Sequence, residues 1–378
     1  MALRTRIASY FLYLIHGYGH TLWDRLVLCI LAGAAVLYRI GVCRKYGMYA
    51  VHPERQTRLK AKVISLGNIT VGGTGKTPAA CMIAKYFQHQ GYETALLNRG
   101  YRSQKESETA VMSDGEHILL SPAVGGDEAC LMARSLPGIP VLVGRERAKS
   151  GALAEQLFHT QILILDDGFQ HWQLHRDLDI VLIDATNPFG NGFLLPRGML
   201  REPLKHLQRA GLFMLTKTDQ VDQADIDSIY TVLGRYNGNA PVIETVHRPT
   251  WCISFADWNS VKENGSCPSL PENTRGIAVS ALGNPASFEQ TVRSMGYILA
   301  DTLRYDDHHQ YGQADGAVMA KKARENRAVL ITTEKDAVKM DAAMIQMYEL
   351  PLYVLGIELE VRKGSAVLQK VLQQTIGG

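Results

Sequence analysis

The sequence predicts an α/β protein: a parallel-sheet domain of the P-loop NTPase type, a second, smaller α/β domain, and an N-terminal membrane-associated helix. Three observations predict this fold class. Apolar runs of strand length alternate with helical patterns over residues 62–216. A glycine-rich loop directly follows the first apolar run. A second strand–helix alternation covers residues 276–374, after a polar stretch.

The N-terminal segment, residues 1–45, is expected to attach to a membrane. Residues 1–50 hold six basic residues and one acidic residue, a net charge of +5 in a chain whose total is +3. An aromatic, amphipathic piece, Ile7–Trp23, precedes the uncharged run Leu26–Tyr38. That run of 13 residues is shorter than the roughly 20 needed to span a bilayer, unless Arg39 reaches the surface. The pattern favours a helix that lies in, or dips into, an anionic leaflet, with a helix packed on the domain as the alternative.

The phosphate-binding loop is Gly-Asn-Ile-Thr-Val-Gly-Gly-Thr-Gly-Lys-Thr-Pro, residues 67–78. Glycines allow the backbone to turn tightly and to direct N–H groups at a polyphosphate. The lysine reaches the β- and γ-phosphates and the following hydroxyl can bind Mg²⁺. The loop departs from the full pattern, because Thr70 stands where a glycine is expected. The residues predicted to bind the nucleotide are Gly72, Gly73, Thr74, Gly75, Lys76 and Thr77.

The remaining elements follow in order. The predicted strands of the core are Lys62–Leu66, Thr94–Asn98, Gln161–Leu165, Asp179–Asp184 and Leu212–Thr216. The predicted helices between them are Pro78–Gln90, Asp127–Ser135 and Arg145–His159. Residues 241–276 are polar and are expected to be irregular, with a β-ribbon as the alternative. The second α/β run comprises strands Gly276–Ser280, near Leu303, Ala328–Thr332 and Pro351–Gly356, and helices from Pro285, over Ala314–Glu325 and to about Gln374.

These patterns predict four parts: residues 1–45, the core 46–240, a connector 241–275 and the smaller domain 276–378. The small net charge does not indicate a nucleic-acid partner, and no obligate protein partner is evident. Six cysteines are scattered without metal-site spacing and indicate reduced thiols in a cytosol-facing protein.

A second element of the predicted site is the apolar strand that ends in Asp166 and Asp167. A carboxylate at the end of such a strand can place Mg²⁺ beside Thr77. Two adjacent acids can divide the work, one near the ion and the other holding a base or a water. Gln170 and His171 follow closely enough to join this network.

Two candidates stay open on spacing alone. Asp127 precedes a helical segment, where it serves equally well as an N-cap or as a carboxylate that accepts a proton from a substrate hydroxyl. Asp307 and His308 in the second domain form either a surface pair or a site pair. If the site involves both domains, His308 could orient Asp127.

Basic residues supply further candidates. Arg99, Arg102 and Arg201, followed by Glu202, lie in loops beside predicted site strands, where guanidinium groups suit phosphate recognition or simply face solvent. Lys335 either clamps phosphate or pairs with a neighbouring acid. The run 216–219, Thr-Lys-Thr-Asp, resembles a nucleotide-base loop without its asparagine and supports no claim for GTP.

Taken together, these strings resemble the tetraacyldisaccharide 4′-kinase family of lipid A biosynthesis. The matching pieces occur in the family's order: Gly67–Pro78, Arg99–Arg102, Gly126–Glu128, Asp166–His171, Gly190–Pro196, Arg201–Glu202, Asp307–His308 and Thr333–Lys339. Each motif is weak alone, whereas eight in order are specific.

The resemblance implies a kinase that moves the γ-phosphate of ATP, with Mg²⁺, to the 4′-hydroxyl of a tetraacyldisaccharide 1-phosphate, the lipid A precursor. It implies a place on the cytoplasmic face of the inner membrane. It assigns Lys76 and Thr77 to phosphates and Mg²⁺, Asp166 and Asp167 to the metal and its network, and Asp127 to the general base with His308 as its partner. His171, Arg201 and Glu202 become supporting site residues, and His309 leaves the register of the base partner slightly open.

Two other functions fit part of the sequence. A soluble small-molecule kinase would need no membrane segment. A nucleotide-switch ATPase that binds a protein partner would share the short loop, but such switches commonly carry a second lysine near Thr70, and they need no second domain with an Asp-His pair.

Overall fold

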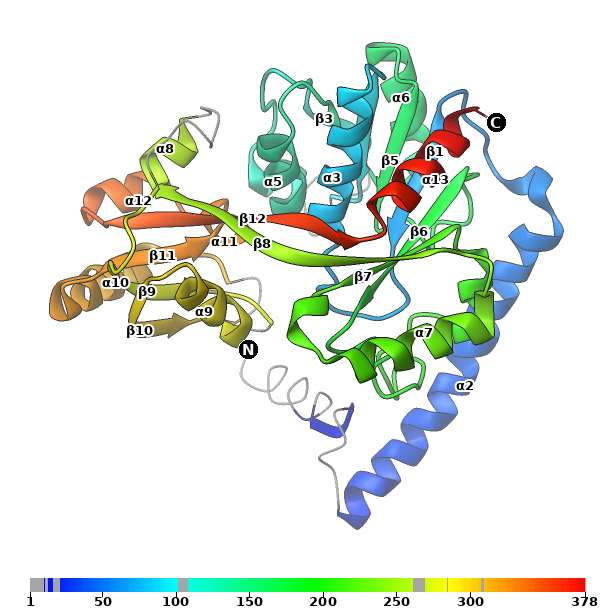
Figure 1. Ribbon diagram of the computed structural model, residues 1–378, viewed down its shortest axis with the longest axis horizontal. Helices are drawn as coiled ribbons and strands as arrows, with labels where there is room; N and C mark the ends of the chain where they lie inside the picture. The colour runs from blue at the N-terminus through cyan, green and yellow to red at the C-terminus, as the bar shows by residue number, and fades with distance from the viewer. Residues whose placement is uncertain are drawn as a thin grey trace. The chain divides into compact units, whose positions relative to one another are not determined.

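A computed structural model describes Tyr10, residues 13–15, 21–100, 108–260, 269–283, 285–306 and 309–377. The chain divides into two compact units (Figure 1). The first comprises Met1–Ala80, Gly151–Val246 and Val361–Gly378, and the second comprises Cys81–Ser150 and His247–Glu360. The boundaries predicted at residues 45, 240 and 275 stay predictions.

The first unit contains a parallel sheet with strand order β8-β7-β6-β1-β5. Its strands are β1 (Lys62–Gly67), β5 (Ile162–Asp166), β6 (Leu178–Asp184), β7 (Leu212–Thr216) and the start of β8 (Val242–Ser254). Nearly every residue of the central strands is buried, as expected for a parallel sheet covered on both faces. The predicted strands of this sheet are therefore confirmed to within one residue.

Parallel register brings the carboxyl ends of these strands to one edge. Leu66 of β1 pairs with Asp166 of β5, and Asp184 of β6 pairs with Thr216 of β7. The loops after β1, β5, β6 and β7 therefore start side by side, which is where parallel α/β sheets bind ligands.

The first unit contains several helices and shares α3 and α6 with the second unit. Their bounds are α2 (Leu22–Val51), η1 (Pro53–Arg55), α3 (Lys76–His89), α6 (Arg147–Phe158), η2 (Leu204–Arg209), η3 (Thr218–Gln220), α7 (Gln223–Asn237) and α13 (Ser365–Gly377). Both α3 and α6 continue across the boundary between the units. The core of this unit gathers around Phe169, Phe213 and Leu207.

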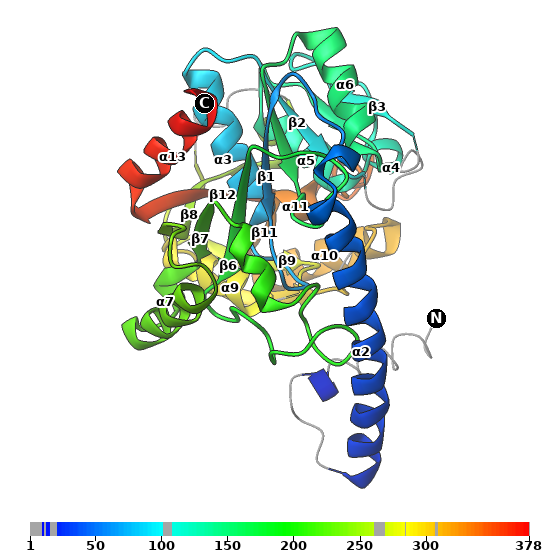
Figure 2. The same cartoon turned by 90° about the vertical axis from the view of Figure 1, so that its right-hand side faces the viewer.

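Helix α2 has 30 residues and begins with a capping box, in which Thr21 and Asp24 satisfy each other's backbone N–H groups. It is longer than the uncharged run in the sequence because it continues through Arg39. It is long and apolar enough to cross a membrane, and little of its apolar stretch is buried. In Figures 1 and 2 its amino-terminal half extends beyond the strands of its unit. The exposed apolar face of α2 comprises Leu22, Trp23, Leu26, Ile30, Val36, Leu37 and Ile40.

The second unit contains two groups of strands. One has the order β2-β4-β3, with β2 (Thr94–Asn98), β4 (Val141–Val143) and β3 (Ala110–Ser113). The other has the order β10-β9-β11-β12, with β9 (Arg275–Ser280), β10 (Ile298–Arg304), β11 (Val329–Thr333) and β12 (Leu352–Lys363). The helices are α4 (Pro122–Gly125), α5 (Asp127–Ser135), α8 (Phe255–Asn259), α9 (Pro285–Ser294), α10 (Gln313–Asn326), α11 (Glu334–Ala337) and α12 (Ala342–Met347).

One segment differs from the sequence prediction. Residues 241–276, expected to be irregular with a β-ribbon as the alternative, contain the 13-residue strand β8 and the short helix α8. Beyond β7, β8 continues beside β12 in the strand order, and Arg248 pairs with Glu360 at 3.0 Å. The prediction missed this strand because the polar run 247–250, which includes Pro249, interrupts its apolar residues, whereas pairing with neighbouring strands continues across that run. Among the described residues, Cys29, Cys43, Cys81, Cys130 and Cys252 form no disulfide.

Candidate functional site

The phosphate loop connects β1 to α3, and Lys76 is the first residue of that helix. Gly72 has φ = +120° and Gly75 has φ = +81°, conformations that a side chain would strain. Backbone N–H groups at the amino end of α3 are free to receive an anion, and the helix dipole favours negative charge there. The local sequence therefore builds the strand, glycine loop and helix on which the phosphate-binding prediction depends.

Thr70 is explained by a pairing that the sequence does not show. The loop runs antiparallel to the segment 199–201: Thr70 pairs with Leu200, Val71 N donates to Met199 O at 2.8 Å, and Arg201 N donates to Ile69 O at 2.7 Å. Extended backbone suits a β-branched residue, so no glycine is needed at position 70. This pairing also fixes the main chain of Arg201 beside the loop.

Asn68 lies at the centre of the loop's contacts and is fully buried. Its side-chain nitrogen donates to Thr74 Oγ1 at 2.9 Å. Its side-chain oxygen accepts from Arg201 Nη1 at 3.2 Å and from Lys76 Nζ at 3.5 Å. Sequence reasoning assigned Asn68 no role.

The carboxylate of Asp167 forms ion pairs with the same two side chains, Arg201 and Lys76. Arg201 forms a bidentate pair with it, at 2.6 Å (Nη1–Oδ1) and 3.2 Å (Nη2–Oδ2), and Lys76 Nζ lies 3.7 Å from Oδ1. Asp167 has φ = +51°, an unusual conformation for a residue other than glycine, and such residues concentrate at functional sites. All three side chains are partly exposed, so a ligand can reach them. The structure thus brings together three predicted site residues: Lys76, Asp167 and Arg201.

Asp166 is the predicted metal ligand and is 3% exposed. It ends β5 in register with Leu66, directly beside the strand that leads into the phosphate loop. The described residues contain no cluster of three acidic, histidine or cysteine side chains that could hold a metal ion. That fits Mg²⁺, which binds one or two carboxylates together with phosphates and water. The donor set of Asp166 and the Thr77 hydroxyl therefore suits Mg²⁺ held jointly with a nucleotide.

Glu202 lies in a buried cluster behind this site. Its carboxylate accepts from Gln170 Nε2 at 2.5 Å and from Arg209 at 2.8 and 3.2 Å, and it lies 2.8 Å from His206 Nδ1. Burial raises the pKa of Glu202, but the hydrogen bonds from His206 and Arg209 outweigh it and hold the pKa below its usual value. Since the side chain is wholly buried, Glu202 supports the site from behind. Gln170 links the cluster to the loop by also donating to Asn68 O at 2.8 Å.

Helix α2 contacts the same region. Tyr38 Oη donates to Arg201 O at 2.9 Å. The ring of Tyr46 lies 4.4 Å from the His206 ring and 5.0 Å from the Arg209 guanidinium, measured to ring centroids. The carboxyl-terminal half of α2 therefore packs on residues that support the phosphate loop.

The end of β7 also reaches the loop. Thr216 Oγ1 donates to Thr74 O at 3.2 Å. Lys217, in a left-handed conformation, pairs with Asp184. The first contact places the predicted 216–219 run beside the loop, and the second joins it to the end of β6. His171 is partly buried, and its carbonyl accepts from Arg176 Nη1 at 2.8 Å.

Asp127 is in the second unit, at the first position of α5. The N-cap is Gly126, with φ = +99°, so the alternative that Asp127 is itself the N-cap is wrong. Asp127 is partly buried, and its carboxylate has no hydrogen-bond or ion-pair partner among the residues that the structure describes.

The other candidates of the second unit are Arg99, Arg102, His308 and Lys335, together with His309. Arg99 is exposed after β2, and Arg102 and His308 lie outside the described residues. His309 lies 3.0 Å from Asp315 Oδ2 through its Nε2 and stacks on Tyr305. That bond gives His309 a local role at the start of α10. Lys335 is partly buried on α11.

Asp336, one of the acids considered as a partner for Lys335, is used elsewhere. It lies 2.7 Å from Lys339 Nζ in a fully buried pair. It also accepts from Thr333 Oγ1 and Ala281 N.

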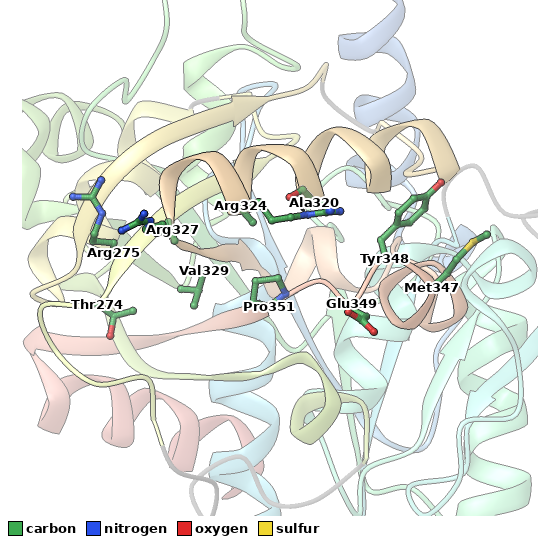
Figure 3. Close-up of a pocket in the computed structure, with 12 residues that line it drawn as sticks. Thr274, Arg275, Ala320, Arg324, Arg327, Val329, Met347, Tyr348, Glu349 and Pro351 are labelled. Carbon is green, nitrogen blue, oxygen red and sulfur yellow. Dashed lines mark hydrogen bonds between the residues drawn. The ribbon is translucent and has the colours of Figure 1, made fainter.

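A cavity of about 760 Å³ in the second unit lies at the amino ends of the strands (Figure 3). Thr274, Ala328 and Pro351 on its wall precede β9, β11 and β12. Arg324 and Arg327 belong to the carboxyl end of α10, where basic side chains complement helix carbonyls, and Arg324 Nε donates to Ala320 O. Because Thr333–Lys339 begins at the opposite end of β11, this cavity is separate from Lys335.

Sequence reasoning assigned no role to Asn68, His206, Arg209 and Tyr38. Asn68 had a usable signal, since an amide next to a buried strand end and a phosphate loop needs a partner. Tyr38 had none, because its hydrogen bond joins α2 to Arg201 across 163 residues of sequence. His206 and Arg209 are four and seven residues from Glu202, so their contacts with it are local in sequence.

Comparison with known proteins gives a consistent result. A family model described as tetraacyldisaccharide-1-P 4′-kinase matches residues 27–376. A tetraacyldisaccharide 4′-kinase of Halothermothrix orenii is 38% identical over 381 residues, covering 98% of this chain and 99% of the relative. One of Anaeromyxobacter dehalogenans is 39% identical over 349 residues, covering 90% of each.

A solved structure shares the fold. It is described as the LpxK of Aquifex aeolicus in complex with ATP, and it is similar with a TM-score of 0.72. The match covers 93% of this chain and 99% of that one at 24% identity.

Proposed function

The chain belongs to the tetraacyldisaccharide-1-phosphate 4′-kinase family, and we propose how its residues perform that reaction. It transfers the γ-phosphate of ATP to the 4′-hydroxyl of the lipid A disaccharide precursor. The observation that supports this best is the convergence of Lys76 and Arg201 on Asp167, at the edge of a phosphate loop. Two cations there can neutralise charge on a transferring phosphoryl group.

The loop 72–77 holds ATP, with its backbone N–H groups and Lys76 on the phosphates. Thr77 and Asp166 hold Mg²⁺, which when bound neutralises charge on the phosphates. Asp167 and Arg201 orient each other, so the guanidinium keeps a fixed direction while remaining partly exposed. Arg99, Arg102, His171 and Lys335 are proposed to line the substrate or phosphate path.

Asp127 is the proposed general base, with His308 as the group that orients it. Two observations support Asp127: its carboxylate is partly exposed, and it has no partner among the described residues. The bond between His309 and Asp315 supports His308 over its neighbour as the partner. A carboxylate in this role accepts the proton of the attacking hydroxyl.

The apolar face of α2 is the proposed membrane contact, on the cytoplasmic face of the inner membrane. An acceptor with four acyl chains leaves a bilayer only at a cost of about 0.8 kcal/mol for each buried CH₂ group, so the enzyme must meet it there. Two features of α2 support this arrangement. Leu37 and Ile40 are exposed on one side of the helix, and Tyr38 on the other side donates a hydrogen bond to the Arg201 carbonyl.

The proposal is tested by transfer of labelled phosphate from ATP to a lipid A disaccharide precursor in detergent micelles. Asp127→Asn is expected to lower kcat by about 10²–10⁴-fold, the usual share of a general base, and to leave ATP binding intact. Glu128→Gln, in the same helical turn but exposed, is the matched control and should keep kcat. Near-normal kcat in Asp127→Asn would exclude the general-base role, and absence of transfer in the unaltered chain would exclude the reaction.

A further inference from the structure

We propose that Asn68 is a positioning residue for this phosphoryl transfer: it holds Lys76 and Arg201 in place without neutralising them. The inference rests on the proposed function, since it gives a role to the two cations of that site. Asn68 lies within the motif 67–78, and the inference gives it a role of its own.

The contacts of Asn68 leave little freedom to its side chain. The residue is fully buried between β1 and the phosphate loop. Its main-chain carbonyl is held by Gln170 at 2.8 Å, and its side-chain nitrogen by Thr74 at 2.9 Å. The amide oxygen is therefore fixed in direction, and both cations lie on it, at 3.2 and 3.5 Å.

Chemistry determines which end of the amide faces the cations. The side chains of Lys76 and Arg201 carry only donors, so they require an acceptor. The amide oxygen meets them and the amide nitrogen meets the Thr74 hydroxyl, which can accept. The reverse orientation would set N–H groups against two cations.

The neutrality of Asn68 has its own consequence. Lys76 and Arg201 carry two positive charges, and Asp167 returns one negative charge. These three side chains sum to +1, and the charge of the neighbouring Asp166 would be offset by the Mg²⁺ that it is proposed to hold. A carboxylate at position 68 would hold the same two cations but would cancel that remainder. An amide therefore gives the geometry of an acceptor and preserves the field that binds ATP.

Two substitutions separate geometry from charge. Asn68→Ala removes the acceptor, so Lys76 and Arg201 lose their fixed direction. We expect kcat to fall about tenfold or more, because misplacement of transition-state contacts costs rate, with KM for ATP changed less than about threefold. Asn68→Asp keeps the shape and adds a charge, so we expect KM for ATP to rise about tenfold or more.

The measurements are kcat and KM for ATP in the micelle transfer assay, with thermal unfolding for each variant. Asn237→Ala is the matched structural control: Asn237 holds three main-chain carbonyls near η2, so its loss should lower the melting temperature and leave kcat unchanged. If Asn68→Ala keeps wild-type kcat per folded molecule, or if Asn68→Ala and Asn68→Asp give the same kcat and KM, the inference is wrong. Absence of transfer in the unaltered chain would instead count against the proposed function.

Discussion

The buried carboxylate of Glu202 allows a quantitative test of how the site is supported. It is 0% exposed and is surrounded by Gln170, His206 and Arg209. Glu202→Gln keeps the size of the side chain but removes its charge and replaces one acceptor oxygen by a donor. The Arg209 guanidinium, 10% exposed, then lies without a carboxylate partner.

The magnitude follows from these contacts. A hydrogen bond to a charged group contributes about 1.5–3 kcal/mol, and breaking a buried ion pair by removing one partner costs about 3–5 kcal/mol. We therefore expect Glu202→Gln to lower the free energy of unfolding by about 3–5 kcal/mol. At about 2–4 °C per kcal/mol for a domain of 150–250 residues, the melting temperature falls by roughly 6–20 °C.

The pH dependence of the free energy of unfolding gives a second test. The pKa of Glu202 is lowered in the folded state from the usual 4.5, because hydrogen bonds from His206 and Arg209 outweigh the effect of burial. A carboxylate whose pKa is lower in the folded state stabilises the fold fully at pH values above its unfolded-state pKa. That stabilisation is lost as the pH falls through its folded-state pKa. The stability difference between wild type and Glu202→Gln should be constant from pH 6 to 8 and shrink below about pH 4.5.

The assay is chemical or thermal unfolding of both proteins in the same detergent. Glu360→Gln is the control, because Glu360 pairs with Arg248 at the surface, where such pairs contribute about 0–1 kcal/mol. A loss below about 1 kcal/mol in Glu202→Gln, or a stability difference that grows toward acid, would refute the reasoning.

Two further pairs of substitutions test the packing around Gly67 and the membrane contact of α2. Gly67→Ala should cost about 1–3 kcal/mol of stability, since a Cβ there would lie 2.5 Å from Phe169 Cβ. Gly234→Ala, with nothing within 4 Å in helix α7, should cost nothing, and equal melting temperatures of these two variants would contradict the packing argument. Leu37→Lys, at a position 72% exposed, should lower the membrane-bound fraction without lowering the melting temperature. Leu31→Lys, on the buried face of α2, should lower the melting temperature, and unchanged membrane binding in Leu37→Lys would show that this face does not meet lipid.

The sequence by itself determined the features that arise from short stretches of chain. The alternation of apolar strands and helices is local, and the predicted strands of the first unit's sheet agree with the structure to within one residue. The glycines at 72 and 75, followed by Lys76, predict the phosphate loop because backbone conformation depends on the residue itself. Eight motifs in order also pointed to the family that the comparisons show.

Only the tertiary structure decided how the site residues are held. Arg201 is 34 residues from Asp167 and 133 from Asn68, and no local pattern predicts that they meet. Thr70 looked like a defect until its pairing with Leu200 was seen, and Gly126, not Asp127, caps α5. Residues 242–254 have apolar residues at both ends and a polar run with Pro249 between them, yet they form the single strand β8, because pairing with neighbouring strands depends on chain segments far away in sequence. Local geometry is set by each residue's own conformational limits, whereas ion pairs, buried amides and strand partners depend on which segments the fold brings together.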